Sequence, residues 1–151
     1  NLLPLIPEAV RAYDELSKYL PGYEFRSFGH NCTDGIRGPV AAIADEMGRA
    51  GWAYHDKVTG DGFGHVIHNW AAVGRPLIGH ARYYEGQRAE VFWQDGVTCI
   101  DLDKHSVEEA AAIISNMTPA EHERMCQNIR GILDATYDPA RDAEKVAELL
   151  R

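Results

Sequence analysis

The amino-acid sequence predicts an α/β fold with a doubly wound, mostly parallel sheet and a helical C-terminal third. Two observations carry this prediction. Short apolar runs alternate with amphipathic segments as far as Ile100, and parallel neighbouring strands need a helical crossover between them. From Ser106 onward, only helical patterns and their start signals occur.

Length and composition place the chain among soluble single-domain proteins. Its 151 residues can bury a real core, and 45% apolar with 25% charged residues excludes disordered and disulfide-dense classes. The 23 acidic and 15 basic side chains give a net charge of -8 without a basic cluster, which argues against nucleic-acid binding. Neither a membrane-length apolar run nor a signal peptide occurs, and the three cysteines have no paired spacing, so we expect a cytoplasmic protein.

The first elements follow from periodicity and turn formers. Apolar side chains at helical spacing predict a helix from Ile6 to Leu20, which a Pro-Gly pair ends. Aromatic residues in near alternation predict a strand from Tyr23 to Phe28. A second helix is expected between Pro39 and Gly51, and the strand Trp52 to His55 follows it.

The central elements repeat the same alternation. A glycine-rich turn precedes a helix that begins near His65 and ends at Gly74, and the strand Leu77 to Gly79 comes next. A short helix is expected around Gln87 to Trp93, and an Asp-Gly turn leads to a fourth strand, Val97 to Ile100.

Three further helices start at capping residues, which are Ser106, Thr118 and Asp138. In the last helix, Val146, Leu149 and Leu150 have little left to cover within one small domain, so we expect them to be loosely packed or exposed. Four strands are few for this architecture, which commonly has about six. The chain therefore reads as a piece of a longer protein whose other strands precede Asn1.

The best candidate site is the turn Gly60-Asp61-Gly62-Phe63-Gly64, between a predicted strand and the helix that begins near His65. In an open parallel sheet, ligands bind beyond the carboxyl ends of the strands, where glycine amides and helix N-termini can hold an anion. Lys57, His30 and His65 are the basic or partly basic residues of this sheet edge, and Lys57 is our candidate for a phosphate contact. The alternative is that the glycines only make a tight turn.

The dinucleotide fingerprint fails at this turn. Gly60 and Gly62 fit its first two glycines, but His65 stands where the third should be, which disfavours nicotinamide or flavin binding. A metal site is also disfavoured, because His55, His65 and His68 are not joined by a third or fourth ligand at recognisable spacing.

The segment from Asp61 to Ile78 reads DGFGHVIHNWAAVGRPLI and resembles the donor-binding segment of retaining glycosyltransferases with two Rossmann-like domains, the GT-B fold. In that family a Glu-Gly-Phe-Gly motif is followed after four residues by Glu-Ala, a small-residue helix, Gly-x-Pro and an apolar strand. The spacing here matches without a gap. The segment from Asp95 to Asp101 is similar to the turn and strand that come next, and the resemblance covers most of the chain, from Gly22 to Leu150.

The resemblance implies that residues 1–151 form the Rossmann-like C-terminal domain of a two-domain glycosyltransferase of the group 1 type. Its expected partners are a nucleotide-diphosphate sugar and the N-terminal domain of the same enzyme, and peripheral membrane association of the full enzyme is compatible with this. No cofactor or metal is implied, and the isolated domain is expected to be inactive because the acceptor side lies in the other domain. The predicted donor-binding residues are Gly29, His30, Lys57, Asp61, Gly62, Phe63, Gly64, His65 and Asn69.

Two positions depart from the family pattern, which has glutamates where this chain has Asp61 and Asn69. Asn69 keeps hydrogen-bonding capacity for ribose hydroxyls but carries no charge. The identity of the donor stays open for this reason. So do two alternatives, a degenerate non-catalytic nucleotide-binding domain and a nucleotide-sugar epimerase of the same fold.

Overall fold

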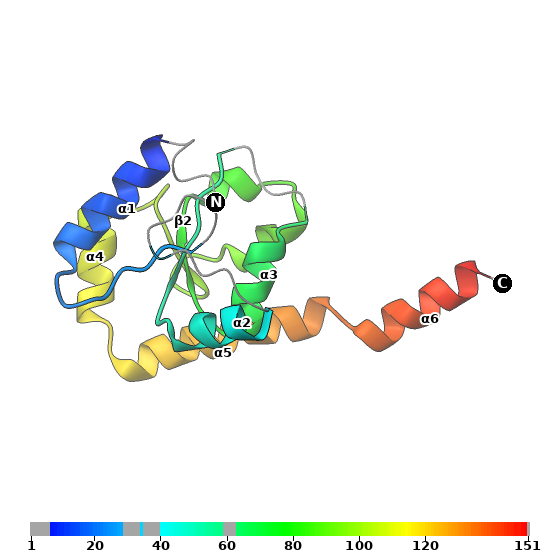
Figure 1. Cartoon of the computed structure of the whole chain (residues 1–151). Helices are drawn as coiled ribbons and strands as arrows, with labels where there is room; N and C mark the ends of the chain where they lie inside the picture. Colours follow the sequence, from blue (N-terminus) through cyan, green and yellow to red (C-terminus); the bar gives the residue numbers. More distant parts are fainter. Residues whose placement is uncertain (1–6, 29–33, 35–39, 59–62, 151) are drawn as a thin grey trace.

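The protein is a mixed α/β domain built on a small parallel sheet (Figure 1). The computed structural model describes residues 7–28, 34, 40–58 and 63–150. Within them, β1 (Ala53–Tyr54), β2 (Leu77–Gly79) and β3 (Cys99–Asp101) lie side by side in the order β1-β2-β3, and both pairings are parallel. The predicted α/β class and the parallel pairing are therefore confirmed.

One face of the sheet packs against α3 (His65–Ala72), the 3₁₀ helices η2 (Ala81–Tyr84) and η3 (Arg88–Phe92), and α5 (Pro119–Thr136). Each strand contributes its alternate side chains to this face, because successive residues of a strand point to opposite sides. The buried residues of this cluster are Ala53, Ile67, Ala71, Leu77, Tyr84, Ala89, Phe92, Trp93, Cys99 and Ile129.

The other face of the sheet packs against α1 (Pro7–Tyr19) and α4 (Val107–Asn116), which lie side by side in Figure 1. Ile78 and Ile100, paired in register on neighbouring strands, supply the sheet side of this second core. The helix side comes mainly from Leu16, Leu20, Ala110, Ala111 and Ile114. Helical layers thus cover both faces of the three strands.

The helix starts of the C-terminal third are as predicted. Ser106 and Glu109 form a complete capping box at α4, and Thr118 and Glu121 form another at α5. In each box, the Ser or Thr hydroxyl accepts a hydrogen bond from the backbone N–H of the Glu, and the Glu carboxylate accepts one from the backbone N–H of the Ser or Thr. These bonds satisfy amides that have no partner in the first turn of the helix. The carboxylate of Asp138 caps α6 (Pro139–Leu149).

The predicted strand from Tyr23 to Phe28 is wrong. This segment is irregular, and its aromatic residues Tyr23 and Phe25 contact helices instead of joining the sheet. Phe25 meets Tyr13 of α1 edge to face at 5.4 Å, and the Tyr23 hydroxyl donates to the carbonyl of Ile114 in α4 at 3.5 Å. Alternating aromatic residues do not distinguish these two kinds of burial. The helix that follows is α2 (Val40–Arg49).

The last strand and the short helix before it also differ from the prediction. The last strand begins at Cys99 rather than Val97, because Val97 and Thr98 still belong to the turn and donate their amides to the Gln94 carbonyl at 2.9 and 2.8 Å. The short helix expected around Gln87 to Trp93 is the 3₁₀ helix η3, and η2 before it was not predicted. The described sheet therefore has three strands instead of four.

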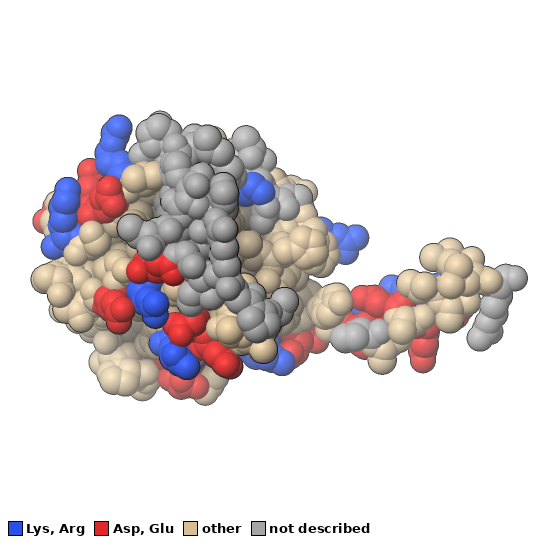
Figure 2. Space-filling view, viewed as in Figure 1, with Lys and Arg blue, Asp and Glu red and all other residues tan. Residues whose placement is uncertain are grey.

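Helix α6 leaves the body of the domain, as Figure 1 shows. Val146, Leu149 and Leu150 are 54%, 86% and 82% exposed, so the expected exposure of this helix is confirmed. Acidic and basic side chains are intermixed along it, and the same intermixing appears on the body surface drawn in Figure 2.

Candidate functional site

The carboxyl ends of the three strands meet at one edge of the sheet, and each is followed by or ends in a polar side chain. Asp56 lies two residues beyond β1, His80 directly follows β2, and Asp101 is the last residue of β3. The side chain of Asp56 is 2% exposed and Asp101 is 4% exposed. Burial of ionisable groups costs free energy unless they are hydrogen-bonded, so the partners of these carboxylates define the edge.

Asp56 and His80 form a tight pair across β1 and β2. The imidazole Nδ1 of His80 lies 2.6 Å from Oδ2 of Asp56, and the backbone N–H of His80 donates to Oδ1 at 3.3 Å. The hydroxyl of Tyr54 shares its one proton between the carbonyl of Ala9 in α1, at 2.9 Å, and the same carboxylate, at 3.4 Å. Burial, and then the nearby Asp56 carboxylate, raises the pKa of Tyr54 far above its ordinary value, so this hydroxyl keeps its proton and remains a donor.

The segment that follows β2 is also held by hydrogen bonds to two carboxylates on the side of β3, Asp101 in the strand and Asp103 in the turn after it. The N–H of Ala81 donates to Asp101 at 3.1 Å, and the N–H of Arg82 donates to Asp103 at 2.8 Å. The guanidinium of Arg82 also pairs with Asp103. His80 therefore starts a segment that is held from both neighbouring strands, which fixes the position of its ring.

The start of α3 stands at the same edge, since this helix follows the loop after β1 (Figure 1). Gly64 caps it in the left-handed conformation, with φ 74°, and an ideal Cβ there would lie 2.6 Å from Cβ of Ala89 in η3. This glycine is required for a turn and a close approach between helices. The amides of His65, Val66 and Ile67 have no acceptor within the helix, because the first helical bond runs from His68 to Gly64.

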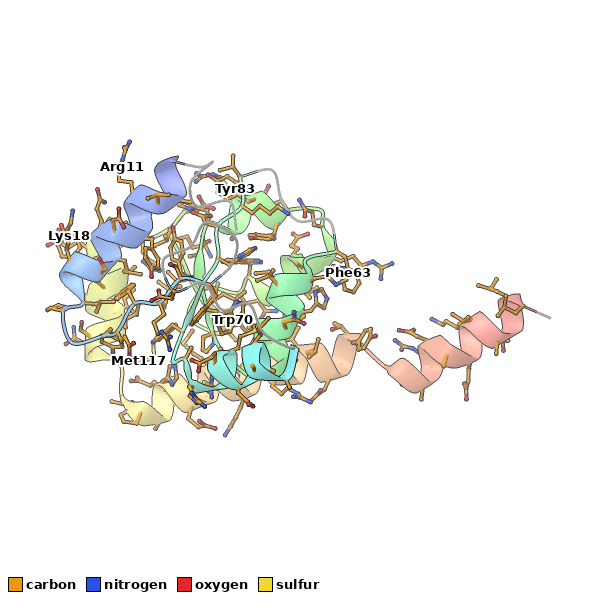
Figure 3. All side chains as sticks on the ribbon, in the orientation of Figure 1. Arg11, Lys18, Phe63, Trp70, Tyr83 and Met117 are labelled. Carbon is orange, nitrogen blue, oxygen red and sulfur yellow. The ribbon has the colours of Figure 1, made fainter. Side chains whose placement is uncertain are left out.

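Phe63 and His68 form an aromatic stack beside this helix start. Their rings are nearly parallel, with centroids 4.5 Å apart, and the His68 ring also meets Phe92 edge to face at 5.0 Å. The His68 Nδ1 donates to the carbonyl of Gly64 at 2.9 Å. Figure 3 shows Phe63 on the outer side of α3. His68 is thus used in packing, and within the described residues no three His, Cys, Asp or Glu side chains gather as metal ligands.

The predicted donor-binding residues divide into three groups. Phe63, Gly64 and His65 come together at the start of α3, and Asn69 is exposed one turn further along. Lys57 is half-buried next to Asp56 and has an interaction within the chain. The remaining predicted residues, Gly29, His30, Asp61 and Gly62, lie outside the described residues.

The site residues predicted from the sequence do not include Asp56, His80 or Asp101. A signal for all three exists in the sequence, because each is a polar residue that lies within two residues of the end of a short apolar or aromatic run that forms a strand. In a parallel sheet such positions converge at one edge.

A cleft of about 300 Å³ lies away from this edge, between the end of α4 and the beginning of α5. Both apolar and polar side chains line it. Its lining residues are Gly96, Ile100, Ile113, Asn116, Met117, Glu121, Arg124 and Met125. None of the predicted site residues contributes to it.

Comparison with models of protein families, with curated proteins and with solved structures found no match to this chain. Among the helices that the structure describes, none combines the length and apolar character needed to cross a bilayer.

Proposed function

We propose that this chain is the donor-binding half of a GT-B glycosyltransferase and that it binds a nucleotide-diphosphate sugar at the carboxyl edge of its sheet. A doubly wound sheet is part of this proposal, and the three described strands would belong to it. The full enzyme would act in the cytoplasm together with its N-terminal domain, with or without peripheral contact with a membrane.

The observation that carries the proposal is the position of the start of α3. Three parallel strands follow one another in chain order, and α3 connects the first two of them. Its first amides, beginning at His65, therefore point beyond the carboxyl ends of the strands. Free amides at a helix N-terminus are suited to a diphosphate, because they donate hydrogen bonds and carry partial positive charge. The segment that resembles the family's donor-binding motif provides this helix start.

Asn69 and the exposed end of the chain add support from two other places. Asn69 is exposed on α3, one turn from His65, where its amide can bond ribose hydroxyls. Val146, Leu149 and Leu150 are exposed on α6, which extends away from the body. In the family that this sequence resembles, such a helix commonly crosses to the partner domain.

Asn69 also favours a second candidate, a nucleotide-binding domain that has lost transfer activity. The amide keeps the hydrogen bonds of the family's glutamate but not its charge. Both candidates bind nucleotide at the same place. They differ only in whether the protein with its second domain transfers or hydrolyses the sugar.

A titration of the ¹⁵N-labelled chain with uridine or guanosine diphosphate tests the proposal. The amide signals of Gly64 and His65 should shift first, and Gly131, in the middle of α5, serves as the unaffected reference. Absence of any shift with both diphosphates at millimolar concentration would overturn the proposal. A response of His55 and His68 to zinc, without a response to diphosphate, would favour a metal site instead.

A further inference from the structure

The Asp56–His80 pair leaves one ring nitrogen of His80, Nε2, without a hydrogen bond to the described part of the chain. His80 is 17% exposed at its side chain, and within the described residues no hydrogen bond reaches its Nε2. Its Nδ1 must donate to Asp56, because an ionised carboxylate only accepts. The second ring nitrogen, Nε2, is then held in one orientation, as an acceptor in the neutral ring or as an N–H donor in the protonated ring.

The charges around His80 favour a neutral hydroxyl over a phosphate. Three carboxylates accept hydrogen bonds from the segment that His80 begins, namely those of Asp56, Asp101 and Asp103. Of the neighbouring cations, Arg82 is paired with Asp103. The second, Lys57, has an interaction of its own. A phosphate placed here would be repelled by these carboxylates, whereas a neutral hydroxyl can form a hydrogen bond with Nε2 without this repulsion.

The aromatic neighbours restrict where such a hydroxyl can approach. The ring of Tyr83 lies 5.4 Å from the His80 ring, and the guanidinium of Arg82 lies over Tyr83 at 4.7 Å. Asp56 occupies the Nδ1 side. Together these groups hold the ring in place and leave Nε2 for a ligand at the carboxyl edge.

We propose that His80, oriented by Asp56, binds a hydroxyl of the sugar of a nucleotide-sugar donor. This inference rests on the proposed function and divides the site into two parts. The amides at the start of α3 take the diphosphate, and Nε2 of His80 distinguishes the sugar. His80 is then a specificity-determining contact, and its contribution appears only when the sugar is present.

The test compares each nucleotide sugar with its own diphosphate on the full 151-residue chain: UDP-glucose with UDP, and GDP-mannose with GDP. In the wild-type chain with ¹⁵N-labelled histidine, the Nε2 resonance of His80 should respond to a nucleotide sugar that binds and not to the diphosphate alone. His80→Asn keeps an N–H at the place of Nδ1, toward Asp56, but removes Nε2. This variant should lower the affinity for the nucleotide sugar about fivefold and change the affinity for the diphosphate by less than about twofold.

His80→Gln is the matched variant, because its amide reaches the place of Nε2, and it should retain more of the sugar affinity than His80→Asn. Two results would overturn the role of His80 without affecting the proposal that the chain binds nucleotide. In one, His80→Asn lowers the affinities for the nucleotide sugar and the diphosphate equally. In the other, the nucleotide sugar binds but the Nε2 resonance does not respond. If neither diphosphate nor nucleotide sugar binds the wild-type chain, the proposed function itself fails, and this result is distinct from the other two.

Discussion

A Cβ atom on Gly64 would lie 2.6 Å from the Cβ of Ala89, so α3 and η3 can pack this closely only because residue 64 is glycine. The left-handed φ of 74° at Gly64 adds a second reason for the same residue. The contact joins the turn that the sequence predicts as an anion site to the buried residue Ala89 of η3. The left-handed turn and the close packing against Ala89 are together enough to explain why residue 64 is glycine.

Gly64→Ala should therefore destabilise the fold by about 2–4 kcal/mol, since it combines left-handed strain with overpacking against Ala89. Gly86→Ala is the matched control, because Gly86 has φ 70° but no atom within 4 Å of its ideal Cβ. It should cost only the strain, about 1 kcal/mol. Urea unfolding followed by circular dichroism measures both, and equal losses would show that the contact with Ala89 contributes nothing.

The elements that were predicted well are those specified by local chemistry. Capping residues such as Ser106 and Thr118 act within one turn of the chain, so their helices can be read directly from the sequence. The segment from Tyr23 to Phe28 could not be read this way. Its aromatic residues are half-buried whether they join a sheet or cover a helix, and only contacts with distant residues such as Ile114 decide between the two.

The Asp56 carboxylate should contribute more to stability than its exposed counterpart Asp103. Asp56→Asn removes the charge from a buried site that accepts from His80 and Tyr54, and we expect a loss of about 1.5–3 kcal/mol. Asp103→Asn weakens a pair with Arg82 whose guanidinium side chain is half exposed, and it should cost at most about 1 kcal/mol. Thermal unfolding of both variants checks the order. A larger loss for Asp103→Asn would contradict it.

Helix α6 should be dispensable for the stability of this domain. A chain that ends at Tyr137 loses Val146, Leu149 and Leu150, which are mostly exposed, and its unfolding free energy should change by less than about 0.5 kcal/mol. In contrast, Ile129→Ala in α5 removes a side chain with 0% exposure and should cost about 2–5 kcal/mol. A large loss on truncation would show that α6 packs on the body in solution.

The stability of the domain should fall above the ordinary pKa of cysteine because of Cys99. Burial, and then the nearby carboxylates of Asp101 and Asp95, raises the pKa of this thiol from its ordinary value of 9.0. The folded state holds the thiol proton more tightly than the unfolded state. The resulting stabilisation is therefore complete below pH 9.0 and is lost as the pH rises above it.

Cys99→Ala should flatten this decline by up to about 1.4 kcal/mol per pH unit. Urea unfolding midpoints and slopes measured at several pH values from neutral to alkaline give the comparison. The slope with pH is the relevant quantity, because the variant also loses packing at a buried position. Parallel curves for the wild type and the variant would contradict the role assigned to Cys99.

The location of the candidate site in the fold could be predicted from the sequence, but only some of its residues could. Glycine and helix-start signals located the beginning of α3, including Gly64 and His65. The pairing of Asp56 with His80 joins positions 24 residues apart, and it depends on the register Tyr54 opposite Ile78. Short strands give few residues from which a register can be derived, so the sequence alone does not show which polar residues meet beyond them.

Asn69 should determine the affinity for the nucleoside part of a ligand. Asn69→Ala removes a hydrogen-bonding amide from an exposed position of α3, and binding of uridine or guanosine diphosphate should weaken about fivefold, or up to about a hundredfold if a ribose hydroxyl is left buried. Asn116→Ala is the matched control, because Asn116 is an exposed asparagine at the end of α4 whose amide donates to the carbonyl of Ala112 in its own helix. Isothermal titration calorimetry gives both affinities. Unchanged binding by Asn69→Ala, together with amide shifts at the start of α3, would place the ribose away from Asn69 while leaving the diphosphate site intact.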